Sequence, residues 1–156
     1  MLALGPLILT RQRGFSLFEV LITVIVISIG LLGLAGLQFA GLRAANSAQD
    51  HTQAALLAQD IAERIHANPG SSYNGILLNS SSVVPAQSCD QTTDCDTGAI
   101  LNYDKYSWQE MIDHSLLANL QIQIIHTGSS PSDYYTVTLT WGNSDNQQTL
   151  VESFAP

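Results

Sequence analysis

The sequence predicts an α+β fold, in which one long N-terminal helix packs on a small antiparallel sheet that also carries one short helix. No proline interrupts residues 15–68, and Asn68-Pro69-Gly70 then forms a strong helix stop. The last third of the chain contains segments in which apolar and polar residues alternate, as in half-buried strands. Hydrophobic residues are 46% of the chain and charged residues 12%, which excludes an intrinsically disordered protein.

The charge divides the chain into two regions. Thirteen acidic and five basic residues give a net charge of -8. Up to Pro69 there are four acids and four bases, whereas from Gly70 onward there are nine acids and one base, Lys105. An acidic surface repels phosphates, so direct binding of nucleic acid is excluded.

The first part of the long helix has the properties of a membrane span. No charged side chain lies between Glu19 and Arg43, and this stretch is about 34 Å long as a helix, which is enough to cross a bilayer. We therefore predict a transmembrane segment at about 20–42. The alternative is a buried core helix, but so small a domain has too little protein to surround it.

Arg11 and Arg13 precede this span, so the positive-inside rule predicts a cytoplasmic N-terminus and an exported remainder. The alternative is a secretory signal peptide that is cleaved within 37–45, where the small residues are Ala40, Gly41, Ala44 and Ala45. The helical pattern continues through those residues, which favours an uncleaved anchor.

Glu19 lies at the edge of the apolar segment. A carboxylate there costs about 2.5 to 3.5 kcal/mol on insertion scales unless it has a partner. One interpretation is that Glu19 is an acid in the first turn of a helix, where the helix dipole stabilises its charge. The other is that Glu19 has a functional role.

Arg13-Gly14-Phe15-Ser16-Leu17-Phe18-Glu19, followed by the apolar helix, resembles the class III signal of type IV prepilins and of the pseudopilins of type II secretion. The resemblance implies that residues 1–14 are a leader, that a prepilin peptidase cuts between Gly14 and Phe15, and that the new amine of Phe15 is methylated. It further implies that Glu19 meets the amine of a neighbouring subunit and sets the subunit register. The apolar character of residues 2–9 departs from the usual short polar leader, so either the leader is unusual or the true start is not Met1.

Ile29 to Gln38 and Ala58 to Pro69 are similar to the PilV-type minor pilins, the type IV pilus modification proteins. This implies a type IV pilin-like fold and a subunit that is stored in the inner membrane with a periplasmic head and then enters a pilus. Its partners would be other minor and major pilins, the prepilin peptidase, the inner-membrane assembly platform and the membrane itself. It would prime pilus assembly, for adhesion, twitching motility or DNA uptake.

Two other functions fit the same residues. A type II secretion pseudopilin has an identical anchor, and a signal-anchored periplasmic binding module would keep its leader.

In the second half of the long helix, apolar residues recur at spacings of three and four, which predicts a packing face. This face consists of Ala54, Leu57, Ala58, Ile61, Ala62 and Ile65. Asp60 and Arg64 form an i, i+4 pair. Gly30, Gly33 and Gly36 allow close approach of neighbouring helices, or they simply reflect the frequency of glycine in membrane helices.

The exported head is expected at 69–156. Residues 71–84 are rich in Ser, Asn and Gly, which indicates an irregular connection. Ser107 and Glu110 have capping-box spacing, which predicts a short helix from Ser107 to about Asn119 whose apolar face contains Trp108, Met111, Ile112, Leu116 and Leu120. The alternating segments predict a three-stranded sheet with strands at 120–126, 134–141 and 148–154.

Cys89 and Cys95 are the only cysteines, and in an exported region they are expected to form a disulfide. Free or zinc-bound thiols are the alternative. Asp90, Asp94 and Asp96 favour a solvated acidic loop over a Ca²⁺ site, because their spacing is not that of an EF-hand.

None of the four histidines has a nucleophile or second ligand at a defined spacing, and no phosphate-binding glycine loop is present. We therefore expect no enzyme, no metal and no cofactor.

Overall fold

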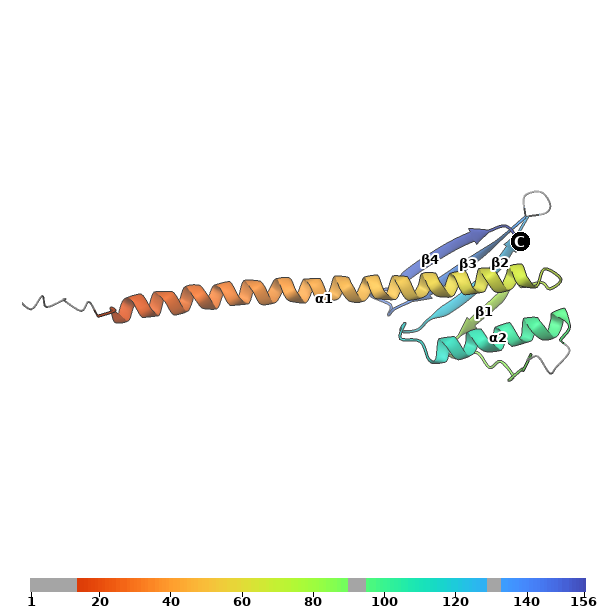
Figure 1. Cartoon of the computed structure of the whole chain (residues 1–156), viewed down its shortest axis with the longest axis horizontal. Coiled ribbons are helices and arrows are strands. Elements are labelled where there is room, and N and C mark those ends of the chain that lie inside the picture. Colours follow the sequence, from red (N-terminus) through yellow and green to blue (C-terminus); the bar gives the residue numbers. More distant parts are fainter. Residues whose placement is uncertain (1–13, 90–94, 129–132) are drawn as a thin grey trace, which may run out of the picture. The chain divides into compact units, whose positions relative to one another are not determined.

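The computed structural model describes residues 14–89, 95–128 and 133–156. They belong to two compact units, one ending at Ala45 and one spanning Asn46–Pro156. The helix α1 runs from Leu17 to Ala67, so its C-terminal part belongs to the second unit (Figure 1). The expected helix of 15–68 therefore begins two residues later, and its expected stop at Asn68-Pro69-Gly70 is confirmed.

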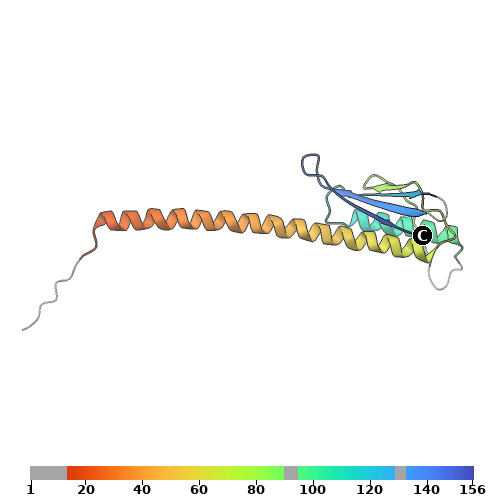
Figure 2. The ribbon, with the colours of Figure 1, turned by 90° about the horizontal axis from the view of Figure 1, so that it is seen from above.

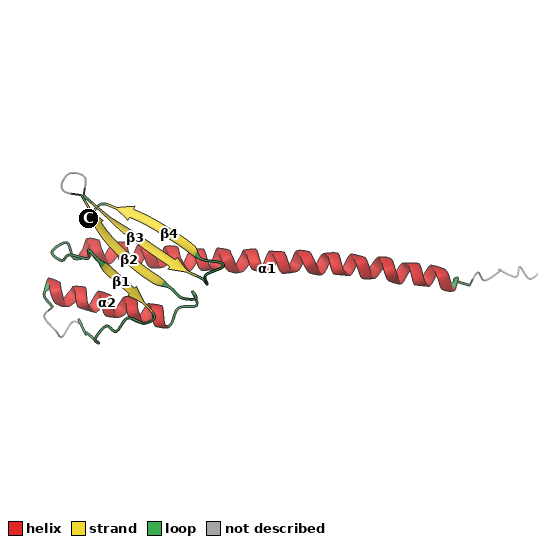
Figure 3. Cartoon of the chain, turned by 180° about the vertical axis from the view of Figure 1, so that it is seen from behind, coloured by secondary structure: helices red, strands yellow, loops and turns green. Residues whose placement is uncertain are grey.

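The second unit contains a four-stranded antiparallel sheet with the strand order β1-β2-β3-β4 (Figure 3). Its strands are β1 (Ile76–Asn79), β2 (Gln121–Thr127), β3 (Tyr134–Trp141) and β4 (Gln148–Phe154). The three strands predicted from alternation are confirmed, with β2 shifted by one residue. The fourth strand, β1, lies within the segment expected to be irregular, so that expectation is wrong. Its four residues pair with β2 from Ile76 opposite Ile124 to Asn79 opposite Gln121.

The helix α2 (Thr97–Asp113) and the C-terminal part of α1 lie on the same side of the sheet (Figure 2). The predicted packing face of α1 is confirmed, because Ala54, Ala58, Ile61, Ala62 and Ile65 are buried and Leu57 packs at the margin of the core. Opposite them, alternate residues of β3, of β2 and of the position just before β2 are buried, which confirms the predicted inward set: Leu120, Ile122, Ile124, Tyr135, Val137, Leu139 and Trp141. This shared core fixes both helices on the sheet.

The beginning and the end of α2 differ from the prediction. Its N-cap is Asp96, whose side chain accepts a hydrogen bond from the backbone N–H of Ala99. Ser107 therefore lies inside the helix and caps nothing, and the helix ends at Asp113, well before Asn119. Trp108 and Ile112 are buried as expected, whereas Leu116 follows the helix and is 79% exposed. The capping-box spacing was misleading because Asp96 provides an earlier cap and no proline separates it from the buried Trp108.

Two turns of the head use residues with a positive φ angle. Gly142 has φ 100°, and a Cβ there would collide with the backbone carbonyl of Asn146. Asn119 has φ 53° and donates hydrogen bonds from its amide to the Gly142 carbonyl (3.2 Å) and to Asn143 Oδ1 (3.1 Å). These contacts tie the entry to β2 to the turn between β3 and β4, in the segment predicted to turn at 142–146.

Candidate functional site

The N-terminal end of α1 is exposed, and its backbone changes conformation at Ser16. The Ser16 carbonyl accepts hydrogen bonds from the backbone N–H groups of Glu19 (3.0 Å) and Val20 (3.2 Å), and these bonds close the first turn of the helix. Gly14 and Phe15 precede that turn in non-helical backbone, and Phe15 is 84% exposed. The Gly14–Phe15 peptide bond is therefore outside the helix and open to solvent.

Glu19 lies in the first turn of α1, where its negative charge is favoured by the helix dipole. Its side chain lines a shallow hollow together with Phe15, Val20 and Thr23. Among the residues that the structure describes, no basic group forms an ion pair with Glu19. The carboxylate is thus available to a group from outside the described chain.

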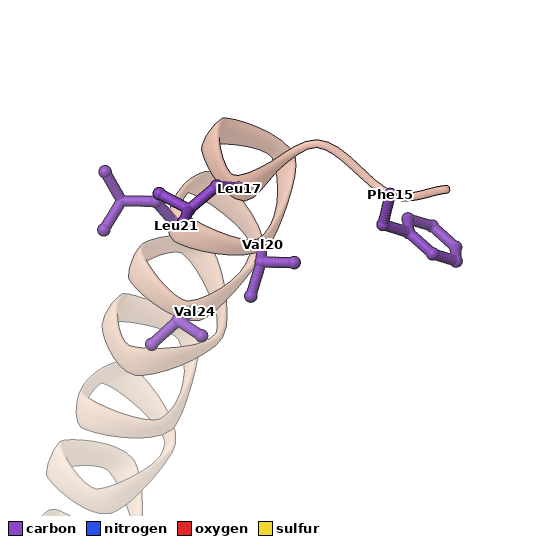
Figure 4. A pocket seen from close by; sticks show the side chains of 5 residues that line it. All are labelled: Phe15, Leu17, Val20, Leu21 and Val24. Carbon is purple, nitrogen blue, oxygen red and sulfur yellow. The ribbon is translucent and has the colours of Figure 1, made fainter. Parts of the chain in front are cut away.

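A second, apolar hollow adjoins the first one. It is lined by Phe15, Leu17, Val20, Leu21 and Val24, whose side chains project from the first turns and from the extended segment before them (Figure 4). The ring of Phe15 stands on that extended segment, clear of the helix (Figure 4). Both hollows share Phe15 and Val20, so an acid and an apolar surface lie next to each other at the predicted cleavage point.

The remainder of the first unit exposes apolar side chains on all sides of the helix. Its exposed large apolar residues, from Phe15 to Leu42, have exposed fractions between 45% and 86%. Among the described residues, α1 is the one helix long and apolar enough to cross a membrane. The two hydroxyl groups of the segment 20–42 are satisfied within the helix, since Thr23 donates to the Val20 carbonyl (2.8 Å) and Ser28 to the Val24 carbonyl (2.7 Å). The segment can therefore lie in hydrocarbon without an unpaired hydroxyl.

The apolar segment ends at Arg43, whose guanidinium lies over the ring of Phe39, 4.8 Å from its centroid. Further back, nothing within the chain lies within 4 Å of a Cβ placed on Gly30, Gly33 or Gly36. The chain's own packing therefore does not require glycine at these three positions.

The head contains a buried polar cluster around Asp104 of α2, which is 3% exposed. One carboxylate oxygen accepts from Arg64 Nη1 of α1 (3.0 Å), and the other accepts from the Tyr73 hydroxyl (2.6 Å). Arg64 also donates to Asp60 (2.8 Å), which confirms the predicted i, i+4 pair, and Asp60 accepts from Trp108 Nε1 (3.3 Å). This cluster joins α2 and the segment after α1 to the C-terminal end of α1.

The cluster changes the titration of two of its members. Burial raises the pKa of Tyr73 well above its ordinary value of 10.0, and the hydrogen bond to Asp104 raises it further. Burial lowers the pKa of Arg64, but the hydrogen bonds and charges of Asp104 and Asp60 outweigh that effect, so the pKa is raised. At neutral pH the tyrosine is a neutral donor and the arginine is charged. The buried carboxylate of Asp104 therefore accepts hydrogen bonds from one neutral and one positively charged group.

Cys89 and Cys95 form a disulfide, with their Cα atoms 5.9 Å apart. The next residue after Cys95 is Asp96, the N-cap of α2, so the bridge ends where that helix begins. Of the acids weighed as a Ca²⁺ site, Asp90 and Asp94 lie outside the described residues.

The histidines make separate contacts, all within the second unit. His51 meets the Trp141 ring edge-on at 5.1 Å, His66 Nε2 lies 2.6 Å from the Ala155 carbonyl, and His126 pairs with Asp133. His114 caps the C-terminal end of α2. The described part of the chain holds no group of three or more His, Cys, Asp or Glu side chains placed to bind a metal ion.

Sequence reasoning missed the cluster around Asp104. Arg64 and Asp104 are forty residues apart, and no local spacing links them. The one available signal was their proximity to apolar residues of the core, such as Ile61 and Trp108, which places their charges next to buried surface.

Two family models match the chain, in adjoining segments. The prokaryotic N-terminal methylation motif matches residues 9–35, and a family described as Type IV pilin Tt1218 matches residues 36–106. Together with the long helix packed on a small antiparallel sheet, these matches decide the family. The chain is a type IV pilin. No curated protein and no solved structure matches it.

Type IV pilins are structural proteins, and the exposed apolar helix fits a membrane-anchored member of the family. The pilin family also indicates interaction with other pilins and with the pilus machinery.

Proposed function

We propose that this pilin is a minor subunit of a type IV pilus, cut by a prepilin peptidase between Gly14 and Phe15 and then built into the filament. One observation carries the proposal: an exposed, non-helical Gly14–Phe15 bond directly precedes an apolar helix with Glu19 in its first turn. Until cleavage, residues 1–14 remain attached at the cytoplasmic end of an inner-membrane anchor at about 20–42, and the head at 69–156 is periplasmic.

The backbone before α1 supports cleavage at this bond. A peptidase needs an extended substrate, and the helical hydrogen bonds begin only at the Ser16 carbonyl. A Cβ on Gly14 would meet nothing within 4 Å, so the chain's own fold does not demand glycine there. In the proposed pathway the demand for glycine comes from the peptidase.

The position of Glu19 supports the proposed subunit registration. Cleavage would create a positively charged amine on Phe15, which lines the same hollow as Glu19. An amine and a carboxylate at the edge of hydrocarbon each carry a desolvation cost, and pairing between neighbouring chains lowers the cost of both. Assembly would thus be favoured when the amine of one subunit reaches Glu19 of the next.

Mass spectrometry of the mature N-terminus tests the processing step. We expect a chain that begins with N-methylated Phe15, and we expect Gly14→Val to accumulate as the uncut precursor. Ser16→Ala is the neighbouring control and should be processed normally. Recovery of an uncut Met1, or of a chain cut after the apolar helix, would refute the processing step.

Replacing Glu19 with glutamine tests the registration step, because Gln has the same size without the charge. We expect Glu19→Gln to insert into the membrane normally but to enter sheared pili about tenfold less, which corresponds to about 1.4 kcal/mol. The control is Glu63→Gln, an exposed acid later on the same helix. Equal recovery of both variants in pili would remove the basis for Glu19 as the registering group.

Co-purification distinguishes a pilus subunit from a type II secretion pseudopilin. The matched family is described as a type IV pilin, which favours the pilus. The protein should therefore be recovered with major pilin in sheared filaments rather than with secretion components.

A further inference from the structure

The outward face of the sheet carries no charge. According to the strand register, this face consists of the residues of the four strands that alternate with the buried ones. They are hydroxyl, amide and apolar side chains: Leu77, Asn79, Gln121, Gln123, Ile125, Thr127, Tyr134, Thr136, Thr138, Thr140, Thr149, Val151 and Ser153. We call this set the outer sheet face.

The rest of the unit is strongly acidic. Residues 46–156 contain twelve acidic side chains and two basic ones, Arg64 and Lys105. Arg64 is held by Asp60 and Asp104. Two copies of the unit therefore repel each other where their acids meet, over a range of about 8 Å at physiological salt. On the outer sheet face, two copies can meet without opposing carboxylates.

The outer sheet face is also uncovered. Both helices of the unit lie on the other side of the sheet (Figure 2). Four apolar side chains on the face are exposed: Leu77 by 56%, Ile125 by 42%, Tyr134 by 41% and Val151 by 59%. Depletion of charge combined with exposed aliphatic and aromatic groups is the composition of the centre of a protein interface.

We propose that the outer sheet face is a self-association surface, on which a second copy of this chain packs sheet against sheet. A basic partner would instead bind the acidic surfaces, and a nucleic acid or an anionic lipid finds no cation on this face. A second copy has the same acidic surface and the same uncharged face, so contact between the two outer sheet faces brings no opposing carboxylates together.

The area of the outer sheet face limits the strength of the contact between two copies. Three strands of seven or eight residues and one of four residues, about 4.8 Å apart, give an area on the order of 400 Å². A stable soluble complex buries about 800 Å² on each partner. The pairing is therefore weak between free molecules and forms between chains whose anchors already hold them in one membrane, where the effective concentration is high.

The test uses the full-length chain in membranes, with two copies that carry different tags. A photo-cross-linking amino acid replaces Gln123, in the middle of the face, or Leu116, which is also exposed but lies off the face. We expect a cross-link between the two tagged copies from position 123 and not from position 116. No cross-link at 123, equal yields at both positions, or adducts only with other proteins would overturn the proposal.

Charge substitutions at Thr138 provide the second measurement. Thr138 pairs with Gln123 and Val151 and lies in the middle of the inner strand β3. Thr138→Asp and Thr138→Lys should each lower the cross-link yield about tenfold, because like charges face each other across the contact, whereas the uncharged Thr138→Asn should not.

Mixing Thr138→Asp with Thr138→Lys should restore the cross-link, since opposite charges then meet. Failure of the mixture to restore it, in chains whose heads resist protease like the parent, would also overturn the proposal. Neither measurement requires cleavage at Gly14. A failure of the self-association proposal can therefore be told apart from a failure of the proposed pilus function.

Discussion

Apolar side chains of α1 are exposed in the first unit of this pilin and buried in the second. In the first unit, Ile29 of α1 is 66% exposed, whereas Ile61, on the same helix but in the second unit, is fully buried. In the second unit the sheet covers the apolar face of α1, whereas the apolar residues of the first unit are exposed in the described part of the chain. The exposed apolar residues of the first unit fit a membrane-anchored pilin, and in the proposed function lipid or neighbouring subunits cover them.

Among the changes that test this difference between the units, Asp104→Ala should lower the stability of the head the most. The change leaves the Arg64 guanidinium and the Tyr73 hydroxyl without their shared acceptor, and breaking a buried ion pair costs about 3 to 5 kcal/mol. Near-UV circular dichroism of full-length protein in detergent during thermal unfolding measures the loss. Asp145→Ala, in an exposed turn, should leave unfolding unchanged, and the helicity of the first unit should persist in both variants.

A matched pair of truncations compares the units directly. Ile61→Ala should lower the free energy of unfolding of the head by about 3 kcal/mol, because it leaves a cavity in the core. The same truncation at Ile29 should leave that free energy unchanged, since this side chain is 66% exposed and is not part of the core. A similar loss of head stability from both variants would mean that the first unit contributes to the fold of the head.

Removing the disulfide should have a smaller effect. Cys89→Ser combined with Cys95→Ser releases a loop of about seven residues, which costs about 2 kcal/mol in the chain-entropy model. Reduction of the parent should give the same shift in denaturant midpoint, and reduction of the double variant should give none. Unchanged stability on reduction would show that the bridge does not constrain the unfolded head.

The smallest effect concerns alkaline pH. The pKa of Tyr73 is raised in the folded head, so its stabilisation is fully present below pH 10 and is lost as the pH rises further. Tyr73 should contribute a decrease of about 1.4 kcal/mol per pH unit above pH 10. Unfolding titrations of the parent and of Tyr73→Phe measure the difference, because the variant lacks this term. Identical slopes would contradict the raised pKa.

The sequence alone predicted features that depend on neighbouring residues. The apolar span, the packing face of α1, the helix stop at Asn68-Pro69-Gly70 and the strands β3 and β4 all follow from local periodicity or turn chemistry. The motif around Gly14, Phe15 and Glu19 was likewise visible as a short run. The positions of these residues before and within the first turn agree with the proposed cleavage and registration, which remain proposals.

Only the tertiary structure decided the features that join distant residues. The strand β1 is four residues long in a polar segment, and its pairing with β2 forms it. The helix α2 begins at an Asp96 cap that resembled one more acid of a solvated loop, and Asp104 meets Arg64 across forty residues. The uncharged outer sheet face likewise emerges only when the register aligns four strands. The periodicity of apolar residues is a property of each segment alone. Pairing between segments depends on the packing of the whole head, which no single segment of the sequence determines.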